Sequence, residues 1–88
     1  IAPILSSRAI VVHPQPLQNQ LNISYNLPAE GNHNWSYAIF NVQGQELVSR
    51  RFSGLEGEEG LAFPYSSGVY FFHIFRDQEL IETRKLLK

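Results

Sequence analysis

The sequence has 88 residues, with 43% hydrophobic residues, 17% charged residues and a formal net charge of −1. A chain of this length and hydrophobic content forms one domain with one modest core, which excludes a disordered or highly charged tail and two or three further domains within these residues. Seven Lys and Arg against eight Asp and Glu give no basic surface for nucleic acids or anionic lipids, and the absence of cysteine excludes disulfides, thiolate metal sites and a cysteine nucleophile.

The start of the chain suggests a piece of a longer protein. It does not begin with Met, and no apolar run of about 18 residues is present, so we expect neither a signal peptide nor direct insertion into a membrane. Residues 1–8 contain Pro and Ser without a clean hydrophobic period, which predicts a linker before the domain. The domain itself is expected over residues 9–88.

The first two predicted strands flank a proline turn. Residues 9–13 form a short strand that ends at Pro14 and Pro16, because proline cannot donate a hydrogen bond to a sheet. Residues 21–27 alternate between apolar and polar side chains, which is the pattern of a strand with one buried face. The side chains expected in the core are Leu21, Ile23, Tyr25 and Leu27.

A hairpin is predicted in the middle of the chain. Residues 35–40 and 46–52 are rich in β-branched, aromatic and alternating side chains and are expected to pair antiparallel. Between them, Asn41 suits the first position of a tight turn and Gly44 suits its left-handed position.

The sequence pattern that predicts the fifth strand is weaker than the pattern that predicts the sixth. Residues 54–60 are acidic and glycine-rich and predict a turn, which confines the fifth strand to residues 61–63. The sixth strand, residues 69–75, is the longest β-branched and aromatic run and follows Gly68, whose backbone freedom suits a turn. One face carries Tyr70, Phe72 and Ile74 and the other Val69, Phe71, His73 and Phe75, so we expect cover on one face at least and, from the composition, on both. Residues 79–88 form the last strand.

Seven short strands separated by turns, with no helical period, predict an all-β fold. The expected architecture is an immunoglobulin-like antiparallel β-sandwich of about seven strands. A small closed barrel is the main alternative.

Four short motifs occur in a fixed order along the chain. They are Val11–Pro16 followed by Leu21–Ile23, Ala38–Gln45, Ser67–Ile74 and Thr83–Lys88. In order and spacing, over residues 9–88, they closely resemble the C-terminal sorting domain (type A) of proteins exported by the type IX secretion system. The residues placed in the family's motifs are Pro14, Pro16, Gly44, Gly68, Tyr70, Lys85, Leu86, Leu87 and Lys88.

The resemblance implies a secretion address without catalysis or cofactor. Domains of this family direct an N-terminal cargo protein from the periplasm across the outer membrane of Bacteroidetes-type bacteria, to the cell surface or the medium. The implied partners are the type IX translocon with its shuttle components and a cell-surface sortase, which cleaves before the domain and attaches the cargo to lipopolysaccharide. Cleavage would fall in or before residues 1–8.

The sequence departs from the family pattern at two places. Gln15 stands where the family often has Asn, which concerns one side-chain hydrogen bond of that turn. The segment from Gly57 to Gly68 is about one residue shorter than usual, with Pro64 and Tyr65 in place of a polar residue and Leu.

The last strand allows two interpretations. A partner could recognise Lys85–Lys88 as an edge strand through added backbone pairing, and edge strands could also join two copies into a homodimer. Alternatively, Leu86 and Leu87 simply close the sandwich while the two lysines stay solvated.

Other functions have weaker support in the sequence. Trp35, Tyr37 and Tyr65 could form an exposed aromatic platform for sugars, which would indicate an adhesive or carbohydrate-binding module, provided that the rings are in solvent. His13, His33 and His73 have no metal-ligand spacing, and Glu56, Glu58 and Glu59 lack the pattern of a calcium loop. An enzyme ranks last because no paired acid and base is visible.

Overall fold

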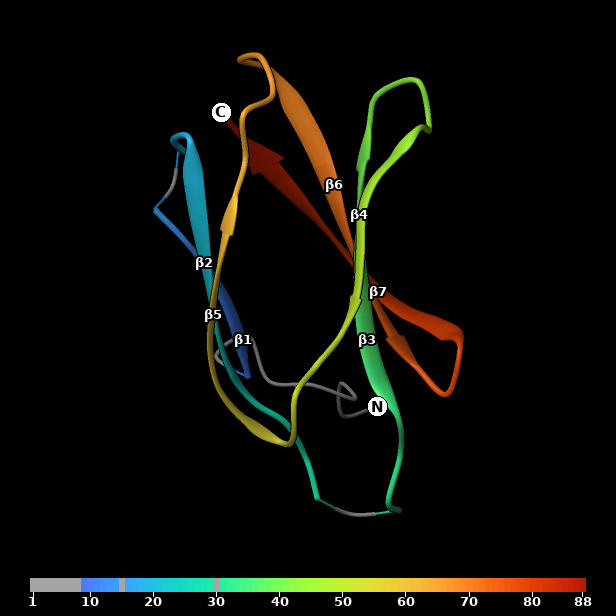
Figure 1. Cartoon of the computed structure of the whole chain (residues 1–88). Helices are drawn as coiled ribbons and strands as arrows, with labels where there is room; N and C mark the ends of the chain where they lie inside the picture. The colour runs from blue at the N-terminus through green and yellow to red at the C-terminus, as the bar shows by residue number, and fades with distance from the viewer. Residues whose placement is uncertain (1–8, 15, 30) are drawn as a thin grey trace.

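The strands pack as two antiparallel sheets, face to face (Figure 1). This computed structural model describes residues 9–14, 16–29 and 31–88, so the predicted linker over residues 1–8 and the departure at Gln15 lie outside it. One sheet has the order β1-β2-β5 and the other β4-β3-β6-β7. The strands are β1 (Ile10–His13), β2 (Gln20–Asn26), β3 (Trp35–Asn41), β4 (Glu46–Arg51), β5 (Glu56–Ala62), β6 (Val69–Arg76) and β7 (Glu79–Leu87).

The predicted all-β sandwich is confirmed, and the closed barrel is not formed, because no strand pairing among the described residues joins the two sheets. The immunoglobulin-like detail stays a prediction. No described segment forms a helix that could cross a membrane.

The core lies between the two sheets and follows the alternation of the strands. The buried residues of β2 are Leu21, Ile23 and Tyr25, and Leu27, just after the strand, is buried as well, so all four predicted core residues are confirmed. In β6 the buried face is that of Tyr70, Phe72 and Ile74. The other face of β6 is only half-buried. Of the two faces that were expected to be covered, the described residues therefore cover one, the face of Tyr70, Phe72 and Ile74. Burying large apolar side chains on one face of each sheet is the main force that holds the two layers together.

The prediction of a turn over residues 54–60 is wrong. Glu56–Ala62 forms β5, which pairs along its whole length with β2, as in Asn22↔Gly60. Glycine suits this strand because its neighbours come close: a Cβ at Gly57 would lie 3.1 Å from the Tyr25 hydroxyl, and one at Gly60 would lie 3.0 Å from Asn22 Oδ1. The acidic residues are tolerated because β5 is an edge strand, with most of its side chains in solvent.

The sandwich has two ends, each made of connections between strands. We call the end that contains residues 16–19, 42–45, 63–68 and 88 the terminal end, since the last residue of the chain lies there; it is uppermost in Figure 1. The opposite end holds the β2–β3 connection, the β4–β5 connection and the β6–β7 turn.

Candidate functional site

The third motif, Ser67–Ile74, and the fourth, Thr83–Lys88, meet at the terminal end. Gly68 and Lys88 exchange both backbone hydrogen bonds, each at 2.9 Å, and Tyr70 lies directly opposite Leu86 across the β6–β7 pair. The Leu17 N–H, just after the proline turn, donates to the Leu87 carbonyl at 2.7 Å. The β6–β7 pairing therefore brings the third and fourth motifs into direct contact, and the packing of the two sheets adds Leu17, the residue after the first motif's proline turn.

The second motif, Ala38–Gln45 in the β3–β4 hairpin, faces the third across a cleft. This cleft has a volume of about 410 Å³ and is open to solvent. Its walls come from the hairpin on one side and from the β5–β6 connection with the start of β6 on the other; they include Asn41, Gln45, Tyr65, Gly68 and Tyr70. The cleft is lined by amides, hydroxyls, aromatic rings and the aliphatic side chains of Val42, Leu47 and Val69, and among its described lining residues tyrosine is the only ionisable type.

The Lys88 side chain joins the two sheets. Its Nζ donates to the carbonyls of Phe63 at 2.7 Å and Tyr65 at 2.5 Å and to Asn19 Oδ1 at 3.1 Å, and it lies 5.6 Å from the centre of the Phe63 ring. Three acceptors match the three N–H groups of an ammonium, so its hydrogen-bonding capacity is used by the protein itself. Lys88 is thus a structural cation at the end of β7.

The other residues of the last motif divide between core and solvent. Leu86 is 1% exposed and belongs to the core, whereas Leu87 is 50% exposed. Lys85 is exposed. The interpretation that both leucines close the sandwich while both lysines stay solvated is therefore right for Leu86 and Lys85 and wrong for Leu87 and Lys88.

Phe63 is the centre of the terminal end and was not singled out from the sequence. It is fully buried, and the rings of Tyr65 and Tyr70 each meet it edge-on with centroids 4.9 Å away. Its N–H donates to the Asn19 carbonyl at 2.7 Å. The Tyr70 hydroxyl in turn donates to the Ser66 carbonyl, which fixes the connection between β5 and β6. A single apolar residue before a proline gave no signal for this role.

The two motif glycines adopt backbone conformations that favour glycine. Gly44 has φ of +83° in the predicted turn, where its N–H donates to the Asn41 carbonyl at 3.0 Å. Asn41 Oδ1 also accepts the N–H groups of Gln43 and Gln45, so the predicted hairpin is confirmed. Gly68 has φ of +154°, and no neighbouring atom lies within 4 Å of the position that a Cβ would take.

We expect Gly68→Ala to lower the free energy of unfolding by about 1–2 kcal/mol, because a side chain is strained at this φ although there is room for it. Urea unfolding of the wild type and the variant measures the change. Ser67→Ala, at the exposed neighbouring residue, is the control with little expected effect. Equal stability of Gly68→Ala and wild type would show that the strain argument is wrong.

The proline turn delivers Leu17 to the core. Pro14 is half-buried and Pro16 is exposed, whereas Leu17 is buried. Because Leu17 also donates its N–H to β7, the turn connects the three-stranded sheet to the edge of the four-stranded sheet.

Both open sides of the sandwich carry charged side chains that point between the sheets. On one side, Arg84 of β7 pairs with Glu82 and donates to the Ile10 carbonyl of β1. On the other, Arg50 of β4 and Glu59 of β5 share the inner faces of their sheets with Tyr37 and Ile23. Burial, followed by the Glu59 charge, raises the pKa of Tyr37, so its hydroxyl stays protonated. Inward-pointing charges at edge strands oppose pairing with a further strand.

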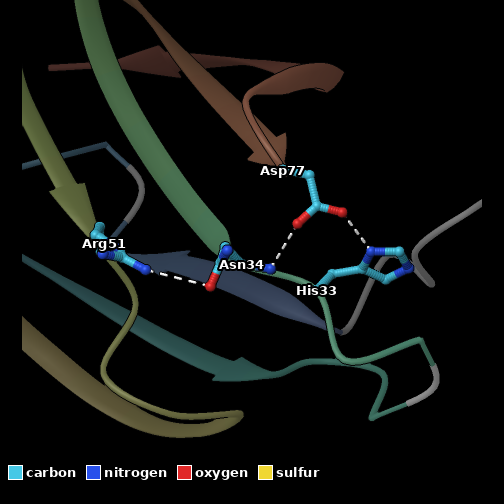
Figure 2. A network of polar contacts seen from close by, with 4 residues as sticks. All are labelled: His33, Asn34, Arg51 and Asp77. Atoms are coloured by element: carbon cyan, nitrogen blue, oxygen red, sulfur yellow. Dashed lines mark hydrogen bonds and ion pairs between the residues drawn. The ribbon is translucent and has the colours of Figure 1, made fainter.

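A polar network closes the opposite end (Figure 2). Asp77, in the β6–β7 turn, pairs with His33 (Oδ2 to Nδ1, 2.5 Å) and accepts the Asn34 N–H at 2.9 Å on Oδ1. Arg51 of β4 donates to Asn34 Oδ1 at 3.2 Å. The network links β4, the β2–β3 connection and the β6–β7 turn, and its position far from the motif residues indicates a structural role.

The Asn34 N–H and His33 lower the pKa of Asp77 below its ordinary value of 3.8. A lowered pKa in the folded state means that ionised Asp77 stabilises the fold above pH 3.8, and that this contribution is lost as the pH falls through the lowered pKa. We expect Asp77→Asn to remove this part of the pH dependence, so the melting temperatures of wild type and variant should converge in acid. Melting curves between about pH 6 and pH 2 test this; parallel curves throughout would contradict it.

The aromatic platform for sugars, which the adhesive or carbohydrate-binding alternative requires, is not formed by Trp35, Tyr37 and Tyr65. Trp35 is 4% exposed and Tyr37 1% exposed, and Tyr65 packs on Phe63. The three histidines lie apart, with His13 at 3.1 Å from the Ser24 hydroxyl and His73 stacked on Phe40. Over residues 9–14, 16–29 and 31–88, no three His, Asp or Glu side chains are close enough together to hold a metal ion.

Comparison with known protein families gives one match that covers most of the chain. A family model described as "Secretion system C-terminal sorting domain" matches residues 11–88. The matched region contains the end of β1 and all the other strands, as well as every motif residue named above. No curated protein matches the chain.

Proposed function

The chain belongs to the family of secretion-system C-terminal sorting domains, and from this premise we propose that its terminal end is the surface that the secretion system recognises. As a type IX sorting signal, the domain interacts with that system and directs transit to the cell surface or the medium. The family is one of signals and not of enzymes.

The full proposal includes the steps before and after translocation. Residues 9–88 form the sorting domain, and a cargo protein precedes it in the chain. The domain folds in the periplasm, meets the translocon and its shuttle components, and crosses the outer membrane with its cargo. A cell-surface sortase then cleaves in or before residues 1–8 and attaches the cargo to the surface.

The observation that supports a folded signal is the contact between the last motif and segments far from it in the sequence. Leu17, Gly68, Tyr70 and Lys88 meet only when both sheets have packed. A linear peptide from the chain end would lack the Phe63 and Tyr65 carbonyls that hold Lys88 in place. A partner that recognises this end therefore distinguishes folded from unfolded domains.

The motif residues separate into two groups by exposure. Tyr70, Leu86 and Lys88 are buried or fully engaged and maintain the fold. Leu87 and Pro16 are exposed at the same end, and we assign them to recognition. Val42, at the tip of the hairpin, is the most exposed large apolar side chain of the described residues and extends the same surface.

Two other proposals have less support. An adhesive or carbohydrate-binding module would need an exposed aromatic platform, and Trp35 and Tyr37 are buried. A homodimer through edge strands stays a prediction, and the inward-pointing charges of β4, β5 and β7 oppose it.

The proposed function is tested by export of a reporter. A periplasm-directed reporter fused to residues 1–88 is expressed in a bacterium with the type IX system and in the same strain without its translocon. We expect the fusion at the surface or in the medium only when the translocon is present, and the reporter alone to stay in the periplasm in both strains. A folded fusion that stays in the periplasm of the complete strain would overturn the proposal.

A further inference from the structure

The outer faces of the two sheets have different chemistry. On the three-stranded sheet, His13, Ser24 and Glu58 form a polar row in which the Ser24 hydroxyl lies 3.1 Å from His13 Nε2 and 3.2 Å from Glu58 Oε2. On the four-stranded sheet, the outer face carries four aromatic rings from its two central strands, which we call the aromatic face: Phe40, Phe71, His73 and Phe75. An outer sheet face in water is ordinarily polar.

The rings of the aromatic face form one continuous row. Phe40 lies opposite Phe71 across the β3–β6 pair, and its ring centroid is 4.7 Å from that of His73. His73 is 6.2 Å from Phe75, edge to face. All four residues are half-buried by their neighbours in the sheet, and no strand of the described residues is layered over them.

Two exposed leucines of β7 extend the row at its ends. Leu87 lies opposite Val69 at the terminal end, and Leu80 lies opposite Phe75 at the other. They are 50% and 48% exposed, which places them among the largest exposed apolar side chains. The aromatic face is therefore continuous with the terminal end through Val69 and Leu87, and Val69 also lines the cleft there.

The charges around the aromatic face are mainly positive. Lys85 lies beside Phe71 and Arg51 beside Ser36 on the same face, against one carboxylate, Glu46, beside Phe40. The acidic residues of β5 belong to the other sheet. A complementary partner would present an apolar surface with a carboxylate placed to meet Lys85.

The size of the face argues against a second copy as its occupant. Four strands about 4.8 Å apart and about seven residues long give roughly 450 Å². Two such faces stacked would bury roughly 900 Å² in total, less than the roughly 1,200 Å² at which stable protein interfaces begin. A partner that covers the aromatic face and the terminal end together would bury more surface than a second copy stacked on the aromatic face alone.

We propose that the aromatic face is a docking surface for a protein of the secretion system, one that presents an apolar patch with a carboxylate opposite Lys85 and that also covers the terminal end. This inference rests on the proposed function and specifies the partner's chemistry. It assigns Lys85 to recognition on this face, and Phe71 and Phe75 to the contact itself.

The test uses the reporter fused to residues 1–88 in the strain with the type IX system. Phe75→Thr removes a ring far from the terminal end and keeps a residue that favours strands. Lys85→Glu reverses the charge at the edge of the aromatic face without changing the core, and Lys85→Arg keeps the positive charge. Val11→Thr, at an exposed valine on the polar outer face of the other sheet, is the matched control.

We expect export to fall roughly tenfold for Phe75→Thr and Lys85→Glu and to stay at the wild-type level for Lys85→Arg and Val11→Thr. Melting curves of the purified domains show whether each variant folds. If Phe75→Thr does not fold, the export of Lys85→Glu alone tests the inference. Export of folded Lys85→Glu at the wild-type level overturns the inference and leaves the proposed function standing. A purified wild-type dimer that Phe75→Thr dissociates also overturns it, in favour of self-association. Failure of the wild-type fusion to be exported overturns the proposed function itself.

Discussion

Replacing Phe63 with alanine is expected to lower the free energy of unfolding by about 3–5 kcal/mol, the largest effect that we predict for the terminal end. The side chain is fully buried, and its loss would leave a cavity between Tyr65, Tyr70 and the Lys88 ammonium. Small domains are stable by only about 5–15 kcal/mol, so this one substitution removes a large part of the total.

Urea unfolding of wild type, Phe63→Ala and Phe63→Leu measures this effect. Phe63→Leu keeps most of the volume and should retain most of the stability, whereas both variants lose the edge-on contacts with the two tyrosines. A loss below about 1 kcal/mol for Phe63→Ala would mean that Phe63 is not the centre of the terminal end.

Lys88→Met is expected to cost about 2–3 kcal/mol of the free energy of unfolding, although lysine is usually a surface residue. Methionine preserves the length of the apolar stem but leaves the Phe63 and Tyr65 carbonyls and Asn19 Oδ1 without the donor that they share. Residues 63–65 should then be held less tightly to the end of β7, although the backbone hydrogen bonds between Gly68 and Lys88 remain.

Lys85→Met is the matched control, because Lys85 lies three residues before Lys88, in β7, and has no side-chain hydrogen bond or ion pair among the described residues. It should change the free energy of unfolding by less than about 0.5 kcal/mol. Equal effects of the two substitutions would contradict the structural role given to Lys88.

Much of the fold could be predicted because the strands have regular patterns. The alternation of Leu21, Ile23 and Tyr25 placed the buried face of β2 correctly, whereas the aromatic run of β6 predicted the strand without deciding which of its faces is buried. The hairpin was predictable from Asn41 and Gly44, because few residues adopt a left-handed conformation as readily as glycine. These signals are local, and each depends on a few neighbouring residues.

Features that depend on distant contacts could not be predicted. β5 has a glycine-rich, acidic sequence typical of a turn, and it becomes a strand because β2 supplies a partner and space for Gly57 and Gly60. The role of Lys88 depends on the carbonyl groups of Phe63 and Tyr65, and the sequence does not predict that these lie near the end of the chain in space. The motif residues of the site were predicted from a family resemblance. Their burial could not be predicted, because it depends on how the two sheets pack together.

The central claim is that the exposed residues of the terminal end are the sorting signal, and one comparison tests it directly. Leu87→Glu and Leu55→Glu place the same charge on side chains of similar exposure, 50% and 41%, at the terminal end and the opposite end. Deleting Lys85–Lys88 would be less informative, since it also removes Leu86 from the core and the Lys88 contacts. With both folded domains fused to the periplasmic reporter, we predict that Leu87→Glu is retained in the periplasm while Leu55→Glu is exported like the wild type. Equal export of the two would contradict the claim.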